Sequence, residues 1–129
     1  MKNITKNQQI YQGMKEICKL AREKGFKAKT VTTKVTLDYQ GKSSRLINET
    51  CNYLLLCEIQ KWLREEFNIE VIPYPVQLEQ NKKEIPQTES IDYHYYYFKD
   101  VIKQFVTGNS FNSYEEALMA GIKETLENL

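Results

Sequence analysis

The apolar residues between positions 51 and 67 recur with the period of a helix rather than with the alternation of a strand. Steps of 100° put these residues on one broad arc, with Lys61, Arg64 and Glu65 on the opposite side. The arc consists of Cys51, Leu55, Leu56, Ile59, Trp62, Leu63 and Phe67. The pattern predicts a long helix that ends at Asn68 and that the fold packs around. Either Ser44 or Asn48 can cap its start.

Two further segments have a helical period. Apolar residues at positions 10, 14, 17, 18 and 21 predict a helix of about five turns that ends at Gly25. Near the carboxyl end, Ser113 and Glu116 form a capping box, which predicts a helix from Tyr114 to about Asn128. Gly121 falls within the buried stripe of this last helix, so a neighbouring backbone is expected close by, most simply the central helix at Trp62 or Leu55.

Three segments have the pattern of strands. Residues 27–39 are rich in β-branched side chains and alternate, with Val31, Thr33, Val35, Leu37 and Tyr39 on one side. Residues 69–76 are strand-like but contain Pro73 and Pro75, whose missing N–H groups predict an edge strand.

The most aromatic segment is Ile91–Phe98, which carries aromatic residues on both faces and is therefore expected to be covered on both sides. Residues 98–106 fit either a strand or a helix, and a bent continuation of the same strand is favoured. Residues 77–90 form a long polar loop or arm. Together these segments predict an α+β fold as a single domain over residues 1–129. It has a small antiparallel sheet packed against helices, in the order helix, strand, helix, strand, strand, helix.

Charge is divided unevenly along the chain. Residues 1–45 contain eleven Lys and Arg against three acids, whereas residues 46–129 contain seven against fourteen. A basic amino-terminal third suits a polyanion such as nucleic acid, with Lys27, Lys29, Lys34 and Arg45 as candidate contacts. The simpler interpretation is that the two halves neutralise each other within the fold or across a dimer. The longest apolar run, Tyr53–Cys57, is too short to span a bilayer, and no secretory leader precedes it, so a cytoplasmic protein with no membrane association is expected.

No constellation of residues indicates an enzyme. His94 is the single histidine, no nucleophile accompanies it in sequence, and the five glycines are scattered singly without a phosphate loop. Cys18, Cys51 and Cys57 lack the spacing of a zinc site and are typical of buried thiols in a reducing compartment. The sequence therefore predicts no cofactor and no metal. A hydrolase centred on His94 is a minor alternative.

Unmatched apolar features favour a partner instead. Leu54 lies behind the apolar arc of the central helix, and alternate tyrosines at positions 93, 95 and 97 share one face of their strand. Leu54, Tyr93, Tyr95 and Tyr97 are the candidate partner surface, and a homodimer is the expected assembly. Bases could also stack on the tyrosines, although the strand lacks the signature of sheet-based RNA-binding modules.

Two segments, QKWLREEFNIEV at 60–71 and FNSYEEALMAGIKETLENL at 111–129, together resemble a recurring family of small uncharacterised proteins. These proteins are encoded by Bacteroides-type gut bacteria and their phages or mobile elements. The resemblance covers about the last two thirds of the chain and is carried by structural motifs. It implies a compact α+β domain of unknown function, cytoplasmic in its bacterium, and it supplies no active residues. The hypothesis from sequence is a non-enzymatic, self-associating interaction module, with nucleic-acid binding as the alternative.

Overall fold

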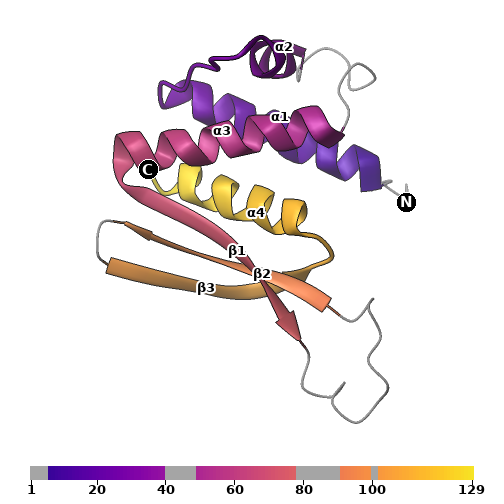
Figure 1. The fold of residues 1–129 in the computed structure, drawn as a ribbon, viewed down its shortest axis with the longest axis vertical. Helices are drawn as coiled ribbons and strands as arrows, with labels where there is room; N and C mark the ends of the chain where they lie inside the picture. The colour runs from indigo at the N-terminus through magenta and orange to yellow at the C-terminus, as the bar shows by residue number, and fades with distance from the viewer. Residues whose placement is uncertain (1–5, 40–48, 78–90, 100–101) are drawn as a thin grey trace.

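The structure, a computed structural model, describes residues 6–39, 49–77, 91–99 and 102–129 (Figure 1). The described residues form four helices and a three-stranded antiparallel sheet with the strand order β1-β2-β3. The elements are α1 (Lys6–Glu23), α2 (Val31–Tyr39), α3 (Glu49–Phe67), β1 (Ile69–Gln77), β2 (Ile91–Lys99), β3 (Ile102–Phe111) and α4 (Tyr114–Glu127). The predicted α+β fold is confirmed, but the predicted order of elements is wrong.

The helices stack on one face of the sheet, with α4 next to the strands, α1 and α3 beyond it, and α2 outermost (Figure 1). Helix α4 contacts all three strands as well as α1 and α3. The element around which the fold packs is therefore α4 rather than the predicted central helix α3. The core formed by this stack includes Met14, Ile17, Leu55, Ile59, Leu63, Val71, Leu118, Ile122 and Leu126.

Helices α1 and α4 confirm their sequence predictions. The apolar stripe of α1 is buried, and Gly25 follows the helix with the positive φ of 100° that ends it. Ser113 caps α4 by accepting a hydrogen bond from the backbone N–H of Glu116 at 3.1 Å. The capping box in the sequence therefore predicted the start of α4 correctly.

Helix α2 replaces the strand predicted for residues 27–39. Thr30 and Thr33 cap it reciprocally, because each backbone N–H donates to the other hydroxyl at 3.2 Å. Thr33, Thr36 and Leu37, which have a helical spacing, are buried, whereas Val31 and Val35 are exposed. The strand predicted from the alternation of β-branched residues is therefore wrong. Local capping and burial against α3 favour the helical conformation instead.

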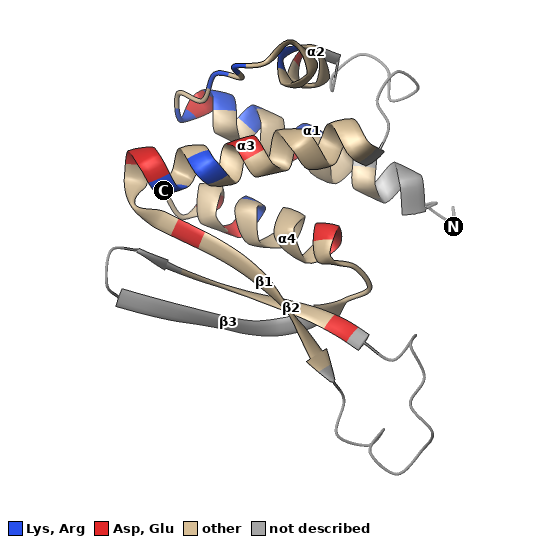
Figure 2. Cartoon of the chain, viewed as in Figure 1, with Lys and Arg blue, Asp and Glu red and all other residues tan. Residues whose placement is uncertain are grey.

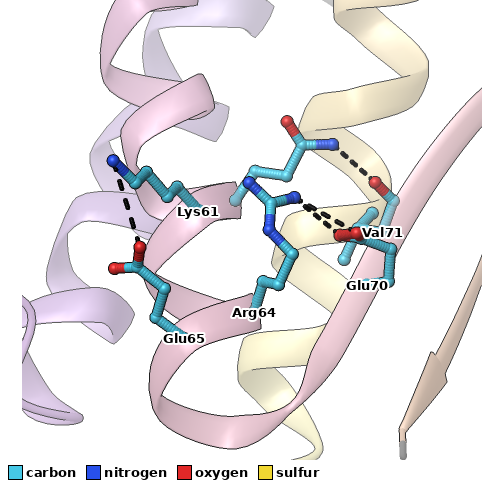
Figure 3. A network of polar contacts seen from close by, with 6 residues as sticks. Lys61, Arg64, Glu65, Glu70 and Val71 are labelled. Carbon is cyan, nitrogen blue, oxygen red and sulfur yellow. Dashed lines mark hydrogen bonds and ion pairs between the residues drawn. The ribbon is translucent and has the colours of Figure 1, made fainter.

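Helix α3 ends at Phe67, next to Asn68, as predicted. Its two candidate caps, Ser44 and Asn48, lie outside the described residues. The Arg64 guanidinium of α3 pairs with both carboxylate oxygens of Glu70 in β1, at 2.7 and 3.2 Å (Figure 3). The Gln60 amide donates to the Val71 carbonyl at 2.6 Å. These contacts fix the angle between α3 and the strand that follows it.

The sheet confirms one strand prediction and corrects another. Strand β1 is an edge strand, as Pro73 and Pro75 predicted. Residues 91–106 do not form one bent strand, because β2 ends at Lys99 and β3 begins at Ile102, which pairs back with Lys99. The observed order is therefore three helices, three strands and a helix. Most of the predicted arm, residues 78–90, lies outside the described residues.

All four described helices lie on the same side of the sheet, so within the described part of the chain a helical layer covers only one face of β2 (Figure 1). Gly121 of α4 does face a close neighbour, but that neighbour is the sheet rather than α3. A Cβ atom at this position would lie 2.7 Å from Val71 Cγ1 and 3.0 Å from Tyr95 Cδ1. The absence of a side chain lets α4 sit directly on β1 and β2.

Candidate functional site

The side of the sheet that no described helix covers is the candidate site, and we call it the outer sheet face. Successive side chains of a strand point to opposite faces, and residues directly across a ladder share a face. Val71, Pro73 and Tyr95 are buried on the helix side. The alternate residues of β1 and β2 are half-buried on the other side. They are Ile72, Tyr74, Val76, Asp92, His94 and Tyr96.

Ring contacts order this face. The Tyr74 ring lies between two rings of β2, with centroids 6.0 Å from His94 and 5.6 Å from Tyr96. His94 Nε2 and the Ser110 hydroxyl of β3 are 2.9 Å apart, which ties the histidine to the neighbouring strand. The aromatic side chains are therefore held in place by one another before any partner arrives.

The His94–Ser110 pair brings a base and a hydroxyl together across sixteen residues of sequence, which the sequence analysis missed. A catalytic pair also needs a group that orients the base and a pocket that holds a substrate. No other described side chain hydrogen-bonds to His94, and the pair lies on the open face of the sheet rather than in a cavity. The pair orders the face, and among the described side chains no third group orients the histidine.

The predicted partner residues Tyr93, Tyr95 and Tyr97 lie on the helix side of the sheet. Tyr95 is only 8 % exposed, and its hydroxyl donates to the Glu124 carboxylate of α4. Burial, followed by this hydrogen bond, raises the Tyr95 pKa above its usual range. Tyr97 packs against the core, and Tyr93 contacts the Tyr114 ring at 6.3 Å. These three tyrosines face their own chain, so the surface that remains open is the opposite one.

Leu54, the fourth predicted partner residue, is 45 % exposed on α3 and belongs to the helical layers rather than to the sheet. Sequence reasoning missed Ile72 and Tyr74, the β1 contribution to the outer sheet face. Their signal was available, because apolar residues occupy the positions on both sides of each proline in IEVIPYPV. An edge strand with apolar side chains on both faces needs more cover than one helical layer gives.

The predicted basic residues gather at one end of the molecule. Lys27, Lys29 and Lys34 are exposed around the start of α2, and Arg45 lies outside the described residues. Figure 2 shows Lys and Arg concentrated over α1, α2 and their connection, whereas the described charges of β1 and β2 are acidic. Within the described ranges, no ion pair joins Lys15, Lys19, Lys27, Lys29 or Lys34 to an acid. The charge asymmetry of the sequence is therefore kept in space.

The described residues give little support for a metal site, a reactive cysteine or a membrane-spanning helix. Among them, no group of three or more His, Cys, Asp or Glu side chains could hold a metal ion. Cys18 is buried, and this burial raises the pKa of its thiol to about 12, which opposes formation of the nucleophilic thiolate. No helix in the described part of the chain is long and apolar enough to cross a membrane.

Comparison with known proteins finds no matching family model, no matching curated sequence and no matching solved structure. The resemblance to the Bacteroides-type proteins stays a prediction. The class to which the chain can be assigned is defined by its fold alone, an antiparallel sheet with helices stacked on one face.

Proposed function

We propose that the protein is a non-enzymatic interaction module that self-associates through the outer sheet face. The main support for this proposal is that β1 and β2 have apolar or aromatic residues on both faces, whereas the described helices cover only one face. An antiparallel sheet that faces water normally alternates apolar and polar residues. Ile72, Tyr74 and Tyr96 break that alternation where the described helices give no cover.

A second copy of the chain is the occupant that this face fits best. Its described charges lie toward its ends, where Glu70 is already paired with Arg64 and Asp92 is the other acid. A partner should therefore present an aromatic surface with few charges. The same face of a second copy is such a surface, and a twofold axis would place the two faces against each other. Two such sheets can pack face to face about 10 Å apart.

The size of the face sets the expected strength. Three strands of nine to ten residues span about 30 Å by 14 Å, which is about 400 Å². A stable complex buries about 800 Å² on each partner. The expected dimer is therefore weak and depends on concentration.

Sedimentation equilibrium from low to high micromolar concentration tests this proposal. The wild type should shift from monomer toward dimer, and Tyr74→Lys should stay monomeric because it places an ammonium group in the middle of the face, where association would have to desolvate the charge. Val31→Lys is the matched control, because Val31 is 78 % exposed on α2, far from the sheet. A wild type that stays monomeric at high micromolar concentration, or a Tyr74→Lys variant that still dimerises, would overturn the proposal.

Nucleic-acid binding by the basic end is the second candidate, supported by the five exposed lysines without an acidic partner among the described residues. Each phosphate contact changes the slope of log K against log salt by about 0.9 for duplex DNA. Binding of a labelled duplex should therefore weaken steeply with salt. Replacing Lys27, Lys29 and Lys34 by Gln should flatten the slope by up to about 3, whereas Lys61→Gln should not change it. No binding at low salt, or an unchanged slope in the triple variant, would exclude this candidate.

A further inference from the structure

Helix α2 is the outermost helix of the fold (Figure 1). Thr33, Thr36 and Leu37 form its buried inner side, whereas Val31 and Val35 are 78 % and 43 % exposed. Residues four apart lie on the same face of a helix, so the two valines form one apolar strip on the outer side of α2. Exposed valines on a helix surface indicate a place where a partner can contact apolar groups.

Basic residues lie before this strip in the sequence and beside it on α2. Residues 22–38 contain five Lys and Arg against two acids, and Glu58 of α3 adds a third acid that contacts this segment. Three of the basic residues are exposed and form no ion pair with a described acid. They are Lys27, Lys29 and Lys34. An apolar strip together with these lysines suits a partner that has phosphates around apolar groups.

The amino terminus of α2 is already occupied, so it is not the place where a phosphate would bind. The Glu58 carboxylate accepts hydrogen bonds from the Lys29 backbone N–H at 2.6 Å and from the Thr33 hydroxyl at 2.8 Å. Its negative charge takes the position that an anion would otherwise take at the end of the helix. The surface that α2 offers to a polyanion is therefore its outer side.

The major groove of duplex DNA matches α2 in size and in chemistry. A helix is about 10–12 Å across and the groove is about 12 Å wide, and nine residues extend about 14 Å, the length of about four base pairs. Thymine presents an apolar methyl group in this groove. The major groove of duplex RNA is too deep and narrow to admit side chains. Helices that lie in a membrane surface insert Trp, Phe or Leu, whereas the outer side of α2 has only valines.

We propose that α2 enters the major groove of duplex DNA, with Val31 and Val35 against thymine methyl groups and Lys27, Lys29 and Lys34 at the phosphates. This inference rests on nucleic-acid binding, the second candidate function, and it adds which element contacts the bases and which base is preferred. Phosphate contacts determine the overall affinity and its salt dependence, whereas base contacts determine the preference among sequences. The two kinds of contact can therefore be tested separately.

Fluorescence anisotropy with three labelled duplexes tests the proposal. They are DNA of alternating adenine and thymine, the same DNA with uracil in place of thymine, and RNA of alternating adenine and uracil. Uracil lacks only the methyl group, and burial of a methyl group changes affinity about fourfold. The wild type should therefore bind the thymine duplex about fourfold or more tightly than the uracil duplex, and the RNA most weakly.

The outcomes separate this inference from the function on which it rests. Equal affinity for the thymine and uracil duplexes, or RNA binding as tight as DNA binding, would overturn the role of α2 and leave nucleic-acid binding in place. No binding to any of the three duplexes at low salt would remove both. Binding to anionic phospholipid vesicles that is lost when the valines are replaced would assign the strip to a membrane surface and overturn the proposal.

Two variants separate the base contacts from the phosphate contacts. Val31→Ser combined with Val35→Ser should keep the helical circular dichroism and the salt slope but bind the thymine and uracil duplexes equally. Lys27→Gln is the control, since it also changes an exposed side chain near the start of α2. It should weaken binding to both DNA duplexes by the same factor, lower the salt slope by about 0.9 and keep the preference for thymine. A preference for thymine that survives in the double variant, or is lost in Lys27→Gln, would contradict the assignment.

Discussion

Gly121 shows how one missing side chain sets the distance between two layers. The glycine stands on α4 opposite Val71 and Tyr95, where a Cβ atom would meet the Val71 methyl at 2.7 Å. Helical propensity alone favours alanine here by about 1 kcal/mol. Overpacking of a tight core costs about 1–3 kcal/mol. The clash is expected to outweigh the propensity.

Gly121→Ala should therefore lower the free energy of unfolding by up to about 2 kcal/mol, as measured by urea denaturation. Gly13→Ala is the matched control, since it also replaces a helical glycine but meets only the flexible end of Met119, at 3.1 Å. This control should be neutral or stabilising by up to about 1 kcal/mol. Equal stability of Gly121→Ala and the wild type would show that α4 and the sheet are less closely packed than described.

The tyrosines of β2 show how much the alternation of side chains along a strand can predict. The period of two correctly separated Tyr93, Tyr95 and Tyr97 from His94 and Tyr96. It could not show which set faces the helices, because both sets are aromatic and the pattern is symmetric between them. Only the tertiary position of α4 distinguishes the two faces.

At the scale of elements, α2 depends on a contact from α3. The Glu58 carboxylate accepts hydrogen bonds from the Lys29 backbone N–H at 2.6 Å and from the Thr33 hydroxyl at 2.8 Å. A negative charge at a helix amino terminus also offsets the helix dipole. With nine residues, α2 is too short to be stable alone, so it needs this support.

Glu58→Ala should lower stability by about 1–2 kcal/mol and reduce the helical signal in circular dichroism, because the amino-terminal end of α2 loses the two hydrogen bonds that the carboxylate accepts. Glu65→Ala is the control on the same helix, since Glu65 makes only an exposed, 3.9 Å contact with Lys61. That change should cost less than about 0.5 kcal/mol. Full retention of helical signal in Glu58→Ala would mean that the Thr30–Thr33 cap, the contacts of Arg22 and the buried side chains hold α2 without Glu58.

Most of the helices and strands, but not all of them, could be predicted from the sequence. Helices α1, α3 and α4 and the strands β1 and β2 follow from period, capping and proline placement. Helix α2 does not, because five of its nine residues are β-branched and the contact that rescues it comes from residue 58. The break between β2 and β3 was missed because residues 98–106 fit either a strand or a helix, and a bent continuation of the first strand was favoured.

At the scale of the whole molecule, the described Lys and Arg residues are concentrated over α1, α2 and their connection, on the side of the molecule away from the outer sheet face (Figure 2). The two proposed interactions should therefore respond differently to salt. Association through an uncharged face depends on apolar burial and should change little between about 0.05 and 0.2 M salt, whereas binding through lysines should weaken by orders of magnitude. The sequence shows apolar residues on both faces of β1 and β2, but it could not show which face stays open, because that depends on where α4 packs.

The position of α4 between the sheet and the outer helices implies an order in which the molecule opens. Amide protons of α4 can exchange with solvent only when the layers around it separate, which is close to global unfolding. Those of α2 can exchange once the helix gives up its contacts with Glu58 and Arg22 and the burial of a few side chains. The outermost helix α2 can therefore unfold transiently, together with the lysine-rich segment around it, while the outer sheet face stays folded.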